Sequence, residues 1–195
     1  MHKQDIIQFF DRLAPQWDAD MIRSDEIIAK IMDGAGIVPG VDVLDVACGT
    51  GVLFPDYLAR RVHSVTAVDI SPEMVKIAAA KFPGENIKVL CADIEELSAE
   101  QQFDCIMVYN AFPHFPDPER LIATLSAHLK PGGTLTVAHG MSRAAIDRHH
   151  EGIASKVSRG LIHEDALAEI FARYLTVTTK ISDDRMYQVT GRWHN

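Results

Sequence analysis

The sequence predicts a single-domain α/β protein with a mostly parallel seven-stranded sheet between two helical layers, three layers in all, and a C-terminal antiparallel hairpin. Its 195 residues suffice for one sizeable core and leave no room for a second. Five short apolar runs alternate with helical stretches through residues 41–139. Two further strand-like runs near the C-terminus lie only four residues apart, which predicts the hairpin.

The N-terminal part is expected to be helical. Apolar residues recur at helical spacing between Ile6 and Leu13, and Pro15 ends this first helix. A second helical pattern runs from Ile22 to Met32 and leads into a loop rich in glycine and proline. Both helices are amphipathic and should therefore pack against the sheet domain.

Strands and helices then alternate. The runs too short for helices and rich in β-branched residues are Val41–Ala47, Val62–Asp69, Ile87–Ala92, Phe103–Tyr109 and Thr134–His139. Helices are predicted between them at Pro55–Arg60, after Ser71 and at Pro118–Leu129. Ser71 suits an N-cap because Pro72 can occupy the first helical position. This alternation favours a parallel sheet that is covered on both faces.

The C-terminal part departs from the alternation. A helix is predicted from Glu164 to Tyr174, followed by strand-like runs at Leu175–Ile181 and Met186–Trp193. Four residues between two strands cannot make a right-handed parallel crossover, so the pair should be antiparallel.

Composition limits the partners and the compartment. Lys and Arg total 19 against 27 Asp and Glu, and the net charge of −8 has the wrong sign for binding nucleic acid phosphates. The three cysteines form no C-x-x-C pair, which fits a reducing compartment. The N-terminus lacks the apolar stretch of a signal peptide, and no run approaches the length of a membrane span. We therefore expect a soluble cytoplasmic protein with no nucleic acid or membrane partner.

The strongest candidate for a ligand site is the turn after the first strand. Residues 43–51 read VLDVACGTG, a strand that ends in Gly-x-Gly, where glycines let a ligand approach the backbone. Asp69 ends the second strand and suits the two hydroxyls of a ribose, and Asp93 ends the third beside an expected purine. Phe54 stands where a dinucleotide-binding motif needs its third glycine, which disfavours a nicotinamide-dependent oxidoreductase.

As an ordered set, these motifs resemble the class I S-adenosylmethionine-dependent methyltransferases, from about Phe9 to Trp193. The resemblance implies a Rossmann-like fold, S-adenosylmethionine as cofactor and S-adenosylhomocysteine as product. It also implies that the helices of residues 1–36 cover the cofactor site and that the last strand is inserted beside the sixth. The residues it assigns to the cofactor are Asp45, Ala47, Gly49, Thr50, Gly51, Asp69, Ile70, Met74, Ala92, Asp93, Ile94 and Asn110.

The methyl acceptor is expected near the ends of the fourth and fifth strands and the segment 140–160. Residues 110–115, NAFPHF, lack the Asn-Pro-Pro-aromatic motif of enzymes that methylate amino groups of nucleic acids and proteins, which favours a small molecule. The candidates for binding it are Trp17, Phe112 and Arg143.

Three histidines are candidate catalytic residues. His114, His139 and His149 could converge as acid/base groups or, alternatively, as metal ligands. Equally, His139 could cap its strand and His149 could be a solvated surface residue. Cys48 in the glycine turn is not expected to be a nucleophile because no base accompanies it in the sequence.

The sequence therefore predicts an enzyme that methylates a small molecule, acting as a monomer or homodimer. The acceptor atom stays open between oxygen, nitrogen, sulfur, carbon and a metalloid. The main alternative is a non-catalytic module or subunit that binds the cofactor. A nucleotide-dependent oxidoreductase is a second and less favoured alternative.

Overall fold

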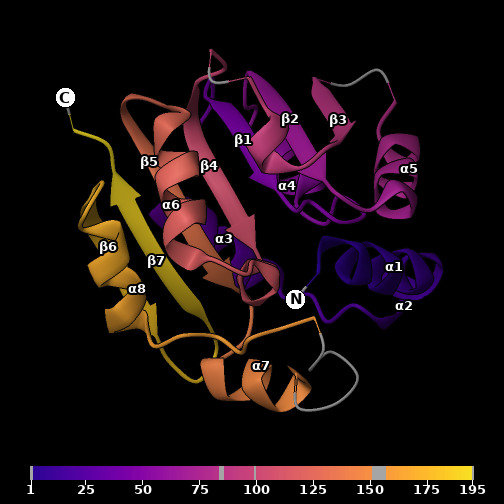
Figure 1. The fold of residues 1–195 in the computed structure, drawn as a ribbon. Coiled ribbons are helices and arrows are strands. Elements are labelled where there is room, and N and C mark those ends of the chain that lie inside the picture. Colours follow the sequence, from indigo (N-terminus) through magenta and orange to yellow (C-terminus); the bar gives the residue numbers. More distant parts are fainter. Residues whose placement is uncertain (1, 84–85, 99, 151–156, 195) are drawn as a thin grey trace.

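The computed structural model describes residues 2–83, 86–98, 100–150 and 157–194, with the side chains of residues 149 and 150 left aside. Its centre is a seven-stranded sheet in the order β3-β2-β1-β4-β5-β7-β6 (Figure 1). The strands are β1 (Asp42–Val46), β2 (Ser64–Asp69), β3 (Ile87–Cys91), β4 (Phe103–Tyr109), β5 (Leu129–His139), β6 (Thr176–Ser182) and β7 (Tyr187–Arg192).

The predicted α/β architecture is confirmed. Strands β1 to β5 pair in parallel, whereas β7 runs antiparallel to both of its neighbours, β5 and β6. The C-terminal hairpin thus adds to the sheet with its second strand inserted beside β5. The strand order reverses direction at β1 and β4, and the carboxyl ends of these strands meet at one edge of the sheet.

Helices cover both faces of the sheet. The α-helices are α1 (Lys3–Leu13), α2 (Trp17–Asp20), α3 (Asp25–Ala35), α4 (Phe54–Ala59), α5 (Pro72–Lys81), α6 (Pro118–Ala127), α7 (Arg143–His150) and α8 (Glu164–Phe171). Short 3₁₀ turns lie at Ala14–Gln16, at Ile94–Glu96 (η2) and at Phe112–His114 (η3). No helix of the described residues has the length and apolar character needed to cross a membrane.

Adjacent strand residues contribute to two separate cores, one on each face. Leu44 of β1 packs with residues of α6 and α8, whereas its neighbour Val43 packs with residues of α3, α4 and α5. Both side chains are fully buried, as expected for a strand at the centre of a covered parallel sheet. The third group of helices, α1 and α2, lies at the edge of the sheet where the parallel strands end (Figure 1).

Several predicted boundaries were wrong. The second helix begins after Ser24, whose hydroxyl accepts a hydrogen bond from Ile27 N, and Ile22 lies outside it with 81% exposure. The fifth strand begins at Leu129, which pairs with Phe103, and the register resumes only at Thr134. The intervening residues 130–133 form a bulge rather than a simple turn before the strand.

The helix start predicted from the Ser71 cap is confirmed, and a second serine caps the start of α7. Ser71 accepts a hydrogen bond from Met74 N at 3.2 Å at the start of α5. Ser142 accepts one from Ala145 N at 3.3 Å at the start of α7. Each cap satisfies a backbone amide that has no partner inside the helix.

Candidate active site

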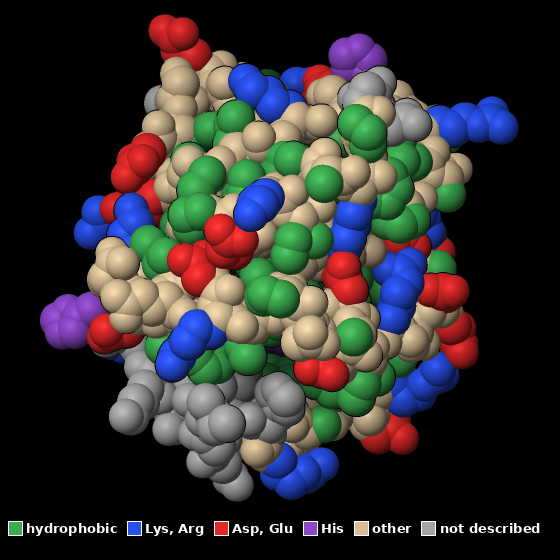
Figure 2. Space-filling view, turned by 90° about the vertical axis from the view of Figure 1, so that its right-hand side faces the viewer, with side chains coloured by type: hydrophobic (Ala, Val, Ile, Leu, Met, Phe, Trp, Pro, Cys, Tyr) green, Lys and Arg blue, Asp and Glu red, His purple; other side chains and the backbone are tan. Residues whose placement is uncertain are grey.

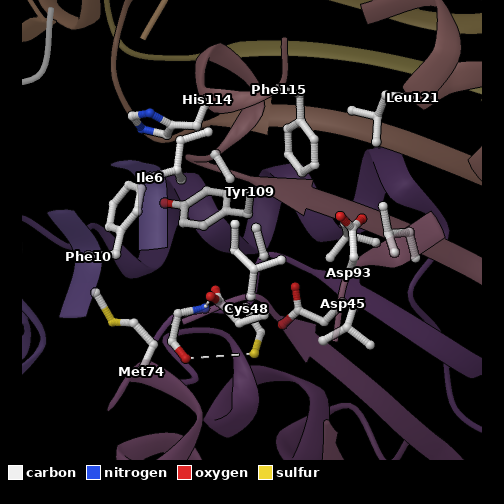
Figure 3. Close-up of a pocket in the computed structure, with 18 of the residues that line it drawn as sticks. Ile6, Phe10, Asp45, Cys48, Met74, Asp93, Tyr109, His114, Phe115 and Leu121 are labelled. Atoms are coloured by element: carbon white, nitrogen blue, oxygen red, sulfur yellow. Dashed lines mark hydrogen bonds between the residues drawn. The ribbon is translucent and has the colours of Figure 1, made fainter. Parts of the chain in front are cut away.

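A cavity of about 450 Å³ opens at the sheet edge where β1, β2, β3 and β4 end. Its floor consists of residues that follow these strands, and its walls come from α1, α2, η2, η3 and the start of α6. Figure 3 shows Asp45, Cys48 and Tyr109 around the same space. The cofactor candidates that line it are Asp45, Ala47, Gly49, Asp69, Ile70, Met74, Ala92, Asp93, Ile94 and Asn110.

The turn after β1 adopts a backbone that favours glycine. Gly49 and Gly51 have φ of +56° and +81°, and Ala47 has φ of 54°, which is uncommon for a residue with a side chain. A Cβ at Gly51 would lie 2.6 Å from the Phe54 ring. The buried Phe54 therefore packs directly beneath the turn, where a dinucleotide-binding motif would have its third glycine.

Asp45 is the most deeply buried carboxyl of the cavity, with 2% of the residue exposed. Burial, and secondarily the charge of Asp69, raises the pKa of Asp45 to about 8. At neutral pH this carboxyl is therefore mostly protonated in the ligand-free protein. A cation placed beside it would stabilise the ionised form.

Asp69 is held in place by the backbone at the end of β2. One carboxylate oxygen accepts from Gly49 N at 2.9 Å and the other from Ser71 N at 2.8 Å. Burial dominates and raises the pKa of Asp69, while these two amides act in the opposite direction. Each oxygen keeps a lone pair for a further donor, which is what a pair of vicinal hydroxyls requires.

Asp93 follows β3 and caps η2 by accepting from Glu95 N at 3.1 Å. Lys3 of α1 lies 2.8 Å from its carboxylate. Burial disfavours the charge of Asp93, but the hydrogen bonds from Lys3 and from Glu95 N together outweigh burial and lower the pKa. The N-terminal helix thus contacts the third strand-end acid directly.

The same segment also contacts the loops after the other two strands. Asp11 of α1 accepts from the Ser71 hydroxyl at 2.5 Å, beside Asp69. Asp18 of α2 accepts from the Thr50 hydroxyl at 2.6 Å and lies 2.5 Å from Lys81. Thr50 therefore supports the turn from outside the cavity and does not line it, and Gly51 does not line it either.

Aromatic side chains form another wall of the cavity. Phe10 packs edge-on against Trp17, with ring centroids 5.7 Å apart, and against His114 at 4.9 Å. The Trp17 Nε1 atom lies 3.8 Å from where a Cβ of Gly49 would be, so the indole lies close to the glycine turn. The His114 Nδ1 atom is 2.7 Å from the carbonyl oxygen of Val157.

Three of the predicted acceptor residues do not join His114 and Trp17. His139 is 2% exposed at the end of β5 and faces the ring of Tyr187 at 6.1 Å, outside the cavity lining. Phe112 is 2% exposed and belongs to the core cluster that includes residues of α6. Arg143 lies on α7, 4.0 Å from Glu164, and does not line the cavity.

The predicted convergence of three histidines is therefore not observed. His114 lines the cavity and His139 does not, while the side chain of His149 lies outside the described residues. Within the part of the chain that the structure describes, no three His, Cys, Asp or Glu side chains are placed to hold a metal ion.

Several cavity residues were missed in the sequence. Tyr109, the last residue of β4, lines the cavity with only 7% of the residue exposed. Tyr109 could have been predicted as a cavity residue because it directly precedes Asn110 at the end of the fourth predicted strand. Lys3, Ile6 and Phe10 also line the cavity and lie on one face of α1, a spacing that the apolar pattern partly indicated.

Cys48 lines the cavity as a neutral thiol. It is 4% exposed, and its thiol donates a hydrogen bond to the carbonyl oxygen of Gly49, with the two heavy atoms 3.6 Å apart. Burial and the charges of Asp45 and Asp69 raise the pKa of Cys48 well above its ordinary value. The expectation that it is not a nucleophile agrees with this environment.

Comparison with known proteins identifies a shared domain. Residues 43–133 match a family model described as a methyltransferase domain. The chain is 34% identical over 148 residues to a ubiquinone biosynthesis O-methyltransferase of Xanthomonas campestris pv. campestris, covering 69% of this chain and 59% of the relative. A relative of the same name from Coxiella burnetii is 34% identical over 141 residues, covering 68% and 60%. The chain thus spans about three fifths of the length of these relatives.

Solved structures share the whole fold. The N-methyltransferase NodS of Bradyrhizobium japonicum, in complex with S-adenosylhomocysteine, superimposes with a TM-score of 0.77 at 16% identity, covering 97% of this chain and 99% of NodS. An S-adenosylmethionine-dependent methyltransferase of Clostridium acetobutylicum gives 0.69 at 17% identity, covering 96% and 99%.

Proposed function

Because this chain belongs to the class I S-adenosylmethionine-dependent methyltransferases, we propose that it transfers the methyl group of S-adenosylmethionine to a small-molecule acceptor and releases S-adenosylhomocysteine. The relatives named above are O-methyltransferases of ubiquinone biosynthesis, which supports a small-molecule acceptor. The charge of −8 supports a function without nucleic acid. We further propose that the protein is cytoplasmic and acts as a monomer or homodimer.

The described residues suit this cofactor. Asp69, fixed by two backbone amides, would accept from the ribose hydroxyls, and Asp93 would face the adenine. The glycine turn leaves space for the methionine part, and Asp45 would face its positively charged groups. The raised pKa of Asp45 supports such a site, since no cation among the described residues offsets the burial of this carboxyl.

The protein's part in the reaction is alignment and exclusion of water. S-Adenosylmethionine supplies a methyl group that its positive sulfur already activates for displacement. Asp69 and the glycine turn would hold the donor from the sheet side, and α1 and α2 contact the strand-end loops through Lys3, Asp11 and Asp18. Holding two reactants in line accounts for much of the acceleration of such a reaction.

The single observation that carries the proposal is the Asp69 carboxylate, whose two oxygens are oriented by Gly49 N and Ser71 N at the cavity floor. S-Adenosylhomocysteine should raise the melting temperature of the protein, and Asp69→Ala should abolish most of that shift. Asp104→Ala, a change at a partly exposed acid outside the cavity, is the matched control and should leave the shift intact. Equal stabilisation of wild type and Asp69→Ala would refute this site.

Two other functions make different predictions. A non-catalytic binding module would show the same stabilisation but form no methylated product with any acceptor. A nucleotide-dependent oxidoreductase would bind a nicotinamide dinucleotide tightly, and the Phe54 ring beneath the turn opposes this.

A further inference from the structure

Trp17 of α2 lines the cavity next to the glycine turn. Its Nε1 atom lies 3.8 Å from the position that a Cβ of Gly49 would take, and the ring of Phe10 packs edge-on against the indole. An indole N–H can only donate a hydrogen bond, and it usually finds a partner where the ring is partly buried. Within the part of the chain that the structure describes, no atom accepts from Nε1. This donor is therefore available to a ligand in the cavity.

The residue after Trp17 fixes α2 to the glycine turn. Asp18 accepts a hydrogen bond from the Thr50 hydroxyl at 2.6 Å and lies 2.5 Å from the Lys81 ammonium. Lys81, at the end of α5, also donates to the Thr50 carbonyl oxygen at 2.7 Å. Because α2 is a helix of only four residues, it is not stable alone and depends on such contacts for its place. Asp18 thereby holds the neighbouring indole beside the turn.

The methionine part of the proposed cofactor carries an ammonium and a carboxylate on the same carbon atom. Asp45 suits the ammonium but repels the carboxylate, which needs a donor elsewhere in the cavity.

The basic side chains of the described cavity lining are already engaged. Lys3 pairs with Asp93 at 2.8 Å, and Arg120 pairs with Glu95 at 2.6 Å. On the outer face that α1, α5 and β3 form, Lys and Arg side chains lie among acidic and hydrophobic ones rather than in one basic patch (Figure 2). Binding the carboxylate with one of these cations would break an existing ion pair, so a neutral donor is favoured.

Resting on the proposed function, we infer that the indole N–H of Trp17 binds the carboxylate of the methionine part of the cofactor, and that Asp18 is the positioning residue for this indole. A hydrogen bond to a carboxylate is stronger than one between neutral groups, and this one leaves the ion pairs of Lys3 and Arg120 intact. Trp17 then selects ligands that carry the complete amino acid. A residue that the sequence placed among the acceptor-binding candidates is thereby assigned to the methyl donor.

Two ligands that differ by one carboxylate test the role of Trp17. They are S-adenosylhomocysteine and S-adenosyl-3-thiopropylamine, which keeps the sulfur and the amine but lacks the carboxylate. Isothermal titration calorimetry gives the dissociation constant of each ligand for each variant. The ratio of the two constants is the readout, because a general loosening of the cavity weakens both ligands alike.

The wild-type protein should bind S-adenosylhomocysteine about 10–100-fold more tightly than the thiopropylamine. Trp17→Phe keeps an aromatic ring but has no N–H, so it should weaken S-adenosylhomocysteine alone and bring the two constants within about 3-fold of each other. An unchanged ratio in Trp17→Phe would overturn the inference.

A pair of variants on the same helix tests the positioning role. Asp18→Ala removes the contacts with Thr50 and Lys81 and should lower the ratio several-fold, because the indole is no longer held beside the turn. Asp20→Ala is the matched control, a change at an exposed acid of α2, and should leave the ratio as it is in the wild type. An unchanged ratio in Asp18→Ala, or an equal loss in Asp20→Ala, would overturn the positioning role.

Failure of this inference can be separated from failure of the proposed function. If the wild-type protein does not bind S-adenosylhomocysteine at all, the methyltransferase function itself is refuted. If it binds both ligands equally well and still transfers methyl groups, only the role of Trp17 is refuted.

Discussion

Replacing Asp45 by asparagine should make the ligand-free protein more stable. It should also abolish the release of a proton that we expect when S-adenosylhomocysteine binds. Burial holds the pKa of this carboxyl at about 8, compared with 3.8 in its ordinary state. The folded protein therefore binds a proton that the unfolded chain releases, so its stability falls as pH rises from about 4 to about 8. At pH 7 this costs the fold about 4 kcal/mol, which the neutral amide of the asparagine side chain avoids.

The same pKa fixes the number of protons released on binding. At pH 7 a carboxyl with this pKa is roughly nine-tenths protonated. The ammonium group of bound S-adenosylhomocysteine should let Asp45 ionise, so the wild-type protein should release about 0.9 proton at pH 7 and about 0.1 at pH 9. Asp45→Asn should release almost none and should bind more weakly.

Isothermal titration calorimetry at each pH, in two buffers of different ionisation enthalpy, gives this number directly. Thermal unfolding of the ligand-free proteins gives the change in stability. Equal proton release by wild type and Asp45→Asn, or a less stable variant at pH 7, would show that Asp45 is not the buried, protonated acid that the structure places in the cavity.

Three further predictions concern the contact of α1 with Asp93, the packing around Tyr109 and the thiols. Lys3→Met removes the half-exposed ion pair with Asp93 and should change the free energy of unfolding by less than about 1 kcal/mol. In stopped-flow measurements it should speed the release of S-adenosylhomocysteine and reduce the salt dependence of that rate, and an unchanged rate would show that this ion pair does not help to retain the ligand. Gly140→Ala should lower the free energy of unfolding by about 1–3 kcal/mol, because the added Cβ meets the Tyr109 hydroxyl. Tyr109→Phe removes that hydroxyl and should recover much of the loss when the two changes are combined. If the effects of the two substitutions on the free energy of unfolding simply add, the clash is contradicted. A maleimide should modify the exposed Cys91 alone in the folded protein, and mass spectrometry showing early modification of either buried thiol would disagree with the fold.

The cofactor floor could be predicted because its signals are local. Asp45, Asp69 and Asp93 each lie at or near the end of an apolar run, and parallel strands bring their ends to one edge whatever the details of packing. The Gly-x-Gly pattern likewise indicates a turn whose backbone favours glycine, and Gly49 and Gly51 have positive φ in the structure. The insertion of the last strand beside the sixth was implied only by the resemblance to a known family.

The acceptor side was predicted less well because it depends on how distant elements pack. Phe10 of α1 and Tyr109 of β4 line the same cavity, and the local pattern of α1 does not specify that this helix lies at the carboxyl ends of the strands. His139 was expected beside His114, but the register of the hairpin places Tyr187 against it. That register follows from the packing of β7 between β5 and β6, which a strand pattern alone does not determine.

Incubation of the purified protein with methyl-labelled S-adenosylmethionine and a metabolite extract, followed by mass spectrometry, tests the central claim most directly. The label should appear in a small-molecule product together with an equal amount of S-adenosylhomocysteine, and Asp69→Ala should lose both. Binding of S-adenosylhomocysteine without transfer of the label to any product would contradict the methyltransferase function and favour a cofactor-binding module.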